Sequence, residues 1–199
     1  MKILVWSCVA VGLLSGLGWL LAPFIVGHHH CSNERNASAS LKTVASAQAD
    51  YRGNDRDENK IQEFWRGDVA GLYGVLPAGS TEMIKLIEIS VAGADDSPLG
   101  KGSIGDTGPG QVARDNYAVF APKAGYYFRA LRHADEDPKA LEPNRFAACA
   151  YPAAYTQATR FTYILDEGNT VFQRDLGRPG PPDVFPDPVT LKRDWSKLD

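Results

Sequence analysis

The sequence is poor in the side chains that most often carry out chemistry. Its 199 residues include three cysteines and four histidines, and three of the histidines are consecutive at positions 28–30. It contains none of the common motifs for a serine nucleophile, a zinc protease or a phosphate loop, and the glycines in residues 100–105 lack the strand–turn–helix context of a dinucleotide site. The remaining histidine, His133, follows the strand-like residues 126–131 in a charged loop, where we expect it to be solvated. We therefore predict that the protein is not an enzyme, with a hydrolase that uses His133 as the weakest alternative.

The sequence also has no excess of positive charge. It contains 21 Lys and Arg residues against 24 Asp and Glu residues, which gives a formal net charge of −3. Binding to nucleic acid or to an anionic membrane surface needs a clustered positive field. The charge balance therefore argues against nucleic acid as a partner and against a polybasic lipid-binding surface.

Charged side chains are missing from residues 3–26. At about 1.5 Å per residue, a helix of this length crosses a hydrocarbon core of about 30 Å. We predict that residues 1–30 form an uncleaved transmembrane anchor that contacts the membrane through residues 3–26, with a cleaved signal peptide as the alternative. The rest of the chain would then be an extracytoplasmic domain facing the periplasm or the cell surface.

The cysteines fit an oxidising compartment without requiring one. Cys8 lies within the apolar segment, and the spacing of the three residues matches no metal-binding motif. Cys31 and Cys149 are candidates for a disulfide bond. Two unpaired thiols are the alternative.

One short segment resembles a calcium-binding loop. Asp55, Asp57, Asn59 and Glu63 occupy positions 1, 3, 5 and 9 of such a loop, where oxygen ligands are expected. Lys60 stands where glycine is usual, and position 12 is not acidic. A degenerate calcium site and a solvated charged turn are both compatible with this pattern, and no other cofactor is indicated.

The order of the predicted elements favours an α+β domain. An alanine-rich apolar stripe predicts a helix over residues 33–52, and a second stripe predicts one over 82–92. Runs rich in aromatic and β-branched residues predict strands, with a hairpin turn at 166–169. The expected strands cover residues 116–121, 126–131, 145–151, 160–165 and 170–175. We expect the head to span residues 31–177, with a helix on an antiparallel sheet, and the proline-rich residues 178–199 to form an extended tail.

Three phrases of the sequence resemble bacterial type IV pilin-like and pseudopilin-like proteins. Residues 36–52 follow the pattern A-x-x-S-L-x-T-x-x-x-A-Q-x-x-Y, which is typical of the pilin helix. Residues 125–129, and the ending formed by 161–163 and 171–177, are similar to pilin-like surface proteins of unassigned function. The processing site that precedes the apolar segment of prepilins is missing from residues 1–5.

This resemblance implies a membrane-inserted helix that carries a pilin-like head, with structural or assembly work in place of catalysis. The implied partners are other pilin-like subunits or surface proteins. Our sequence-based hypothesis is therefore a non-enzymatic, membrane-anchored protein that acts in surface assembly or protein–protein contact. An anchored calcium-dependent binding module is the alternative.

Overall fold

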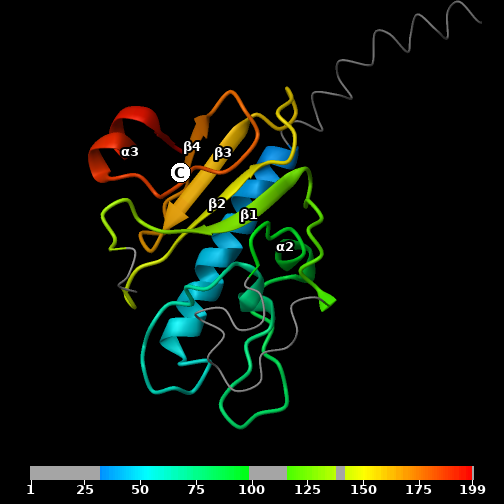
Figure 1. The fold of residues 1–199 in the computed structure, drawn as a ribbon, viewed down its shortest axis with the longest axis vertical. Coiled ribbons are helices and arrows are strands. Elements are labelled where there is room, and N and C mark those ends of the chain that lie inside the picture. Colours follow the sequence, from blue (N-terminus) through cyan, green and yellow to red (C-terminus); the bar gives the residue numbers. More distant parts are fainter. Residues whose placement is uncertain (1–31, 99–115, 138–141, 199) are drawn as a thin grey trace, which may run out of the picture.

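A computed structural model describes residues 32–98, 116–137 and 142–198. These residues form three layers: a long helix, an antiparallel sheet, and a C-terminal segment on the far side of the sheet (Figure 1). The long helix crosses behind the strands, and the C-terminal segment with its short helix lies beside the last strands (Figure 1).

The long helix covers residues 32–53 of the described chain. Its buried positions include residues 37, 41, 44, 48 and 51, a spacing of alternately four and three residues that keeps one side against the sheet. The helix ends in a turn in which Asn54 N–H donates to the Asp50 carbonyl at 3.1 Å and Arg56 N–H donates to the Tyr51 carbonyl at 3.1 Å. The stripe predicted from the sequence is therefore the face that packs on the sheet.

The sheet has five antiparallel strands in the order in which they occur along the chain. Neighbouring strands are thus also consecutive ones, and Asn169 N–H closes the β3–β4 turn on the Asp166 carbonyl at 2.9 Å. The strands are β1 (Tyr126–Leu131), β2 (Ala147–Pro152), β3 (Phe161–Asp166), β4 (Phe172–Asp175) and β5 (Ser196–Lys197).

Both faces of the sheet are buried. On one face, Phe128, Ala148 and Leu165 pack with the long helix in the main core. On the other face, Cys149 and Ile164 pack with residues of the C-terminal segment. Because successive side chains of a strand point to opposite faces, all six residues of β2 are buried.

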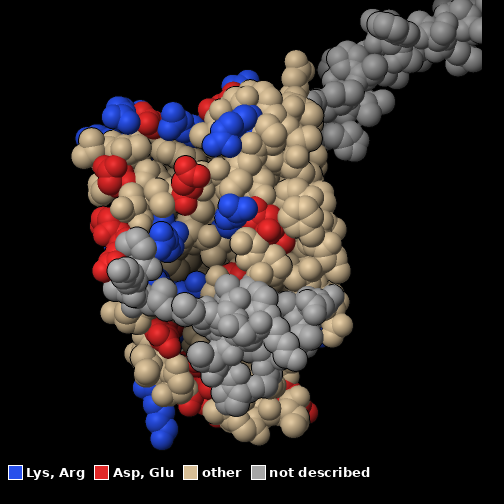
Figure 2. All heavy atoms as spheres, viewed as in Figure 1, with Lys and Arg blue, Asp and Glu red and all other residues tan. Residues whose placement is uncertain are grey.

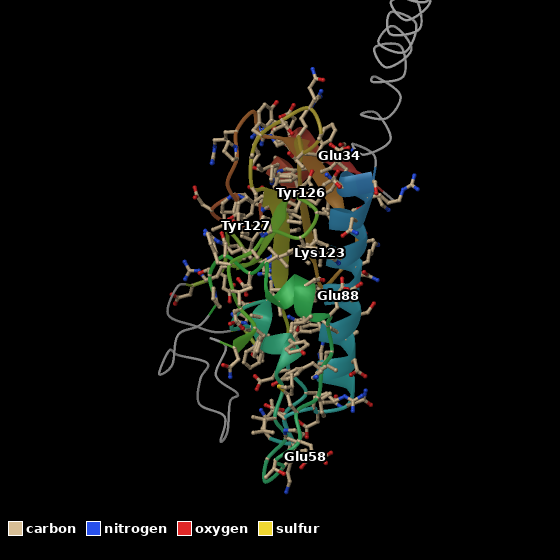
Figure 3. All side chains as sticks on the ribbon, turned by 90° about the vertical axis from the view of Figure 1, so that its right-hand side faces the viewer. Glu34, Glu58, Glu88, Lys123, Tyr126 and Tyr127 are labelled. Atoms are coloured by element: carbon tan, nitrogen blue, oxygen red, sulfur yellow. The ribbon has the colours of Figure 1, made fainter. Side chains whose placement is uncertain are left out.

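Two short helical elements lie between the long helix and the sheet in sequence: the 3₁₀ helix η1 (Ala70–Tyr73) and α2 (Ile89–Ala92). Lys123 connects this region to the long helix, because its Nζ is ion-paired with Glu88 and donates to Ser40 Oγ at 2.8 Å. Figure 3 shows Lys123 beside Glu88 where the chain enters β1.

The C-terminal segment differs from the extended tail that we predicted for residues 178–199. Helix α3 (Pro188–Asp194) is capped by Asp187, whose carboxylate accepts from Val189 N–H at 2.9 Å and from Thr190 N–H at 3.1 Å. Trp195 and Phe185 are buried in the second core, and β5 pairs with β4. The proline-rich composition misled the prediction because it hid two aromatic anchors and a capped helix start.

The predicted fold class and localisation also need correction. Among residues 32–98, 116–137 and 142–198, the structure shows no helix with the length and apolar character needed to cross a membrane. This finding contradicts the transmembrane helix in the fold-class prediction and the single-pass localisation. The long helix at 32–53 is amphipathic: residues 35, 39, 43 and 46 are exposed, while its other side packs on the sheet. The segment proposed as the anchor, residues 1–30, lies outside the described residues.

Of the predicted elements, one is shortened and one is absent in the part of the chain that the structure describes. The second helix shrinks from residues 82–92 to Ile89–Ala92, because residues 75 and 84 pair in an isolated bridge instead of joining a helix. Residues 116–121 form no strand. Phe120 has a positive φ of 54°, which is incompatible with an extended strand, and its ring stacks on Tyr127 at 4.7 Å.

Candidate functional site

A cavity of about 190 Å³ lies between the long helix, the start of the segment that leads to η1, and the ends of β1 and β2 that face each other. Figure 2 shows a hollow on the face of the molecule that carries β1, with basic side chains around it. Apolar and polar side chains both contribute to its wall, and the polar ones come from segments far apart in the sequence. The lining includes Val44, Gln48, Arg66, Leu72, Glu136 and Phe146.

A buried ion pair forms one wall of the cavity. Arg66 Nη2 donates to Glu136 Oε1, and the side chains are 13% and 3% exposed respectively. The second oxygen of Glu136 accepts from His133 N–H at 3.3 Å, so both of its carboxylate oxygens are engaged. Arg66 Nη1, in contrast, is buried without a hydrogen-bond partner among the described residues.

A buried amide forms another wall. Gln48 is 4% exposed, and its Nε2 donates to the backbone carbonyl of Trp65 at 2.6 Å. Its Oε1 is buried and has no hydrogen-bond partner within the described ranges. Gln48 and Arg66 thus both line the cavity, and each holds one buried polar atom without a partner among the described residues.

Two buried carboxylates hold the backbone that carries Arg66. Asp68 Oδ1 accepts from Gly71 N–H at 2.8 Å, while Asp95 Oδ2 accepts from Val69 N–H at 2.8 Å and from Ala70 N–H at 2.7 Å. Burial and the nearby charge of Asp68 raise the pKa of Asp95 to about 7. The segment before η1 is thus fixed by side-chain acceptors, which gives the cavity a rigid rim.

His133 does not occupy the exposed loop that we expected. It is buried against the Phe185 ring, and its Nε2 lies 3.2 Å from the Phe146 carbonyl and 3.3 Å from Glu167 Oε2. Because both neighbours are acceptors, Nε2 carries the proton. Burial opposes the charged ring, but the hydrogen bond and charge of Glu167 outweigh it and raise the pKa of His133. His133 is not among the residues that line the cavity, and its ring connects the 132–136 loop to Phe146, Glu167 and Phe185.

The four candidate calcium ligands are only partly brought together. Asn59 Nδ2 donates to Asp57 Oδ2 at 2.8 Å and to Glu63 Oε1 at 2.9 Å, while Asp55 Oδ2 accepts from Lys60 N–H at 3.0 Å. Amide and backbone donors thus take up one oxygen of each carboxylate. In the described ranges, no group of three His, Cys, Asp or Glu side chains is placed to hold a metal ion. The calcium site stays a prediction.

Of the two cysteines of the candidate disulfide, the structure describes Cys149, and the pairing stays a prediction. This residue has a free thiol, fully buried on the face of the sheet that the C-terminal segment covers. Burial raises the pKa of the thiol, which makes it unreactive. Cys31 lies outside the described residues.

The sequence contained one usable signal for this cavity. Gln48 falls on the buried stripe of the long helix, where an apolar residue is expected, so a polar side chain at that position is informative. Arg66 and Glu136 gave no such signal, because they are 70 positions apart and each sits in a charged stretch of sequence.

Fold and cavity together define a domain in which one helix packs on an antiparallel meander and a small polar cavity opens beside them. Comparison with protein families matches residues 26–183 to the family described as Protein of unknown function (DUF2950). This match covers more than half of the chain, and the chain belongs to that family. No curated protein and no solved structure matches the chain. The resemblance to pilin-like proteins receives no support from these comparisons and stays a prediction.

Proposed function

We propose that the domain is a non-enzymatic binding module whose cavity takes up a small polar ligand. The observation that carries this proposal is a cavity of about 190 Å³ that is lined by both polar and apolar side chains, among them Gln48, Arg66 and Glu136. Polar side chains from segments far apart in the sequence converge on this cavity beside apolar ones, which is typical of a site for a small molecule.

The composition of the lining supports binding more than reaction. Among the described residues, no Ser, Thr, Cys, Lys or His lines the cavity. Its two carboxylates are held by other groups, Glu136 by Arg66 and the His133 N–H, and Asp68 by the Gly71 N–H. Neither a nucleophile nor a free general base is therefore offered to a molecule in the cavity.

The test is a fragment screen on the full chain by NMR. Small polar compounds at millimolar concentration are added, and the side-chain N–H signals of Gln48 and Arg66 are followed. Ala148, which lines the cavity, is replaced by Leu to fill it, and Ala154→Leu in the exposed turn after β2 is the matched control. We expect shifts in the wild type and in Ala154→Leu that disappear in Ala148→Leu. If no compound shifts these signals, or if Ala148→Leu responds like the wild type, the binding function is wrong.

A second candidate is the protein–protein contact that the sequence predicted. Ile89, Val119 and Phe120 are 54%, 62% and 57% exposed. Their segments are adjacent, because Ala121 N–H donates to the Gly93 carbonyl at 2.8 Å. Exposed apolar side chains grouped in this way are typical of a contact surface. Sedimentation velocity of the full chain over a hundredfold concentration range tests self-association, which Val119→Asp should weaken. A constant sedimentation coefficient would remove self-association.

A further inference from the structure

We propose that Asp68 and Asp95 form a proton switch behind one wall of the cavity: the pair holds this wall while it keeps one proton, and loosens the wall when that proton is lost. Both side chains are buried, at 2% and 0% exposure. Asp95 Oδ2 accepts from Val69 N–H and Ala70 N–H, and Asp68 Oδ1 accepts from the next one, Gly71 N–H. Two carboxylates thus take up three consecutive N–H groups where η1 begins. The effect of the switch on a ligand rests on the proposed binding function.

The two carboxylates also connect separate segments to this point. Asp95 Oδ1 accepts from Ser97 N–H at 2.9 Å, and Asp68 Oδ1 lies 3.3 Å from the indole Nε1 of Trp65. Two like charges in a poorly solvated site repel each other, so such a pair keeps a proton more readily than a single carboxylate does. Burial and the charge of Asp68 raise the pKa of Asp95 to about 7, although its three N–H donors act in the opposite direction.

The other titratable or charged groups near Asp95 lie on the opposite face of the sheet. Residue 95 pairs with β1 in an isolated parallel bridge, so Asp96 points away from Asp95, and its Oδ1 lies 2.7 Å from Arg129 Nε. Asp96 also accepts from the Tyr151 hydroxyl, which completes an ion pair with its own hydrogen bonds. Burial raises the pKa of the Cys149 thiol, which therefore stays neutral. The charge that acts on Asp95 is thus that of the other member of the pair.

The pair is connected to the cavity through the backbone. Residues 66–69 line the cavity one after another, whereas residues 94–97 do not line it. When Asp95 loses its proton, two negative charges face each other between these segments, and their repulsion acts directly on the wall. The wall should therefore be held most firmly below pH 7. A ligand that fits the cavity in that state should bind more weakly above pH 7.

Further charged side chains line the cavity on the side of Asp68. They are Arg66, Arg132, Arg145 and Glu136. Arg66 is paired with Glu136, and Arg145 Nη1 lies 3.0 Å from Asp135 Oδ1. Arginine keeps its charge throughout the neutral range.

His133 is a second group that titrates in the neutral range. It lies outside the lining, with Nε2 3.3 Å from Glu167 Oε2, and its pKa is raised from the ordinary value of 6.5. Its protonation can also shift signals from the loop that carries Glu136. A test of the switch therefore needs a variant that removes the titration of Asp95 alone.

The test is an NMR titration of the full chain from pH 4 to 9, without any ligand. The backbone N–H signals of Val69 and Ala70 report on Asp95, and that of Gly71 reports on Asp68. The methyl signals of Leu72 report on the cavity, which this residue lines. We expect all of these signals to move with one midpoint near pH 7. Since no ligand is added, a negative fragment screen would refute the binding function and leave the switch standing.

Three variants assign the transition. Asp68→Asn removes the like charge and should lower the midpoint by about one pH unit or more. Asp95→Asn should abolish the transition at Val69 and Leu72, and it decides the assignment alone if Asp68→Asn does not fold. Asp187→Asn is the matched control, because Asp187 also accepts from two backbone N–H groups but does so at the surface, in the cap of α3. It should leave the midpoint unchanged.

Three results would overturn the switch. The first is a wild-type midpoint below pH 5, which would mean that Asp95 holds no proton near neutrality. The second is a midpoint that Asp68→Asn does not move, which would mean that the two carboxylates are not coupled. The third is a Leu72 signal that stays constant in the wild type or still titrates in Asp95→Asn, which would separate the pair from the cavity wall.

Discussion

Removal of one partner of the Arg66–Glu136 pair should lower the free energy of unfolding far more than removal of both partners. The Glu136 side chain is 3% exposed, so in Arg66→Met its carboxylate remains buried without the guanidinium. Loss of one partner of a buried pair typically destabilises a protein by about 3–5 kcal/mol. Glu136→Leu should cost less, about 1–3 kcal/mol, because Arg66 is 13% exposed and closer to water. The double variant replaces the pair by apolar side chains and should lie within about 2 kcal/mol of the wild type.

The assay is urea unfolding of the four proteins of this double-mutant cycle, followed by tryptophan fluorescence. The expected coupling free energy is about 2–8 kcal/mol, the summed losses of the two single variants less the loss of the double variant. If the double variant loses as much stability as the two single variants added together, the pair is not coupled. The Arg66–Glu136 contact would then contribute nothing to the stability of this wall of the cavity.

Three further predictions concern other parts of the fold. The pKa of Asp95 is raised to about 7 in the folded state, so folding favours the neutral form of its side chain. The free energy of unfolding should therefore fall as pH rises from about 4 to 7, by at most about 1.4 kcal/mol per pH unit. Asp95→Asn should flatten this slope in urea titrations. Gly71→Ala would place Cβ within 2.5 Å of Cε2 of the Trp65 ring and should lower stability by about 1–3 kcal/mol in thermal unfolding, whereas Gly53→Ala, with open space around it, should change it little. Trp195→Ala should cost about 3–5 kcal/mol in urea unfolding, and a loss below 1 kcal/mol would contradict an integral C-terminal segment.

The residue ranges of the long helix and of β1 could be predicted from the periodic pattern of their apolar side chains. The long helix shows the helical spacing clearly, and β1 lies at the predicted residues 126–131. The burial of both faces of β2 could not be read in the same way, because it depends on a C-terminal cover that its prolines concealed. Long-range burial also explains the error at His133, which is polar and flanked by charges but packs under Phe185.

The cavity was less predictable than the fold. Gln48 was visible as a polar residue in an apolar stripe, but its partner is a backbone carbonyl of a different segment. The Arg66–Glu136 pair depends on how the 132–136 loop folds back towards η1, and nothing local in either stretch of sequence specifies that contact. Pairing between distant charges is a property of the tertiary fold, which composition and periodicity do not encode.

The order of the strands has a consequence for how the protein behaves at high concentration. An open sheet edge is a template on which another chain can add a strand. Here the β1 edge is occupied in part, since Phe128 N–H donates to the Ala94 carbonyl and Asp96 N–H donates to the Phe128 carbonyl. At the opposite edge, β5 has only two residues, Ser196–Lys197, both exposed and one of them a lysine. Both edges are thus guarded against fibril-like growth, and any assembly of these domains would have to use side-chain surfaces in preference to strand exchange.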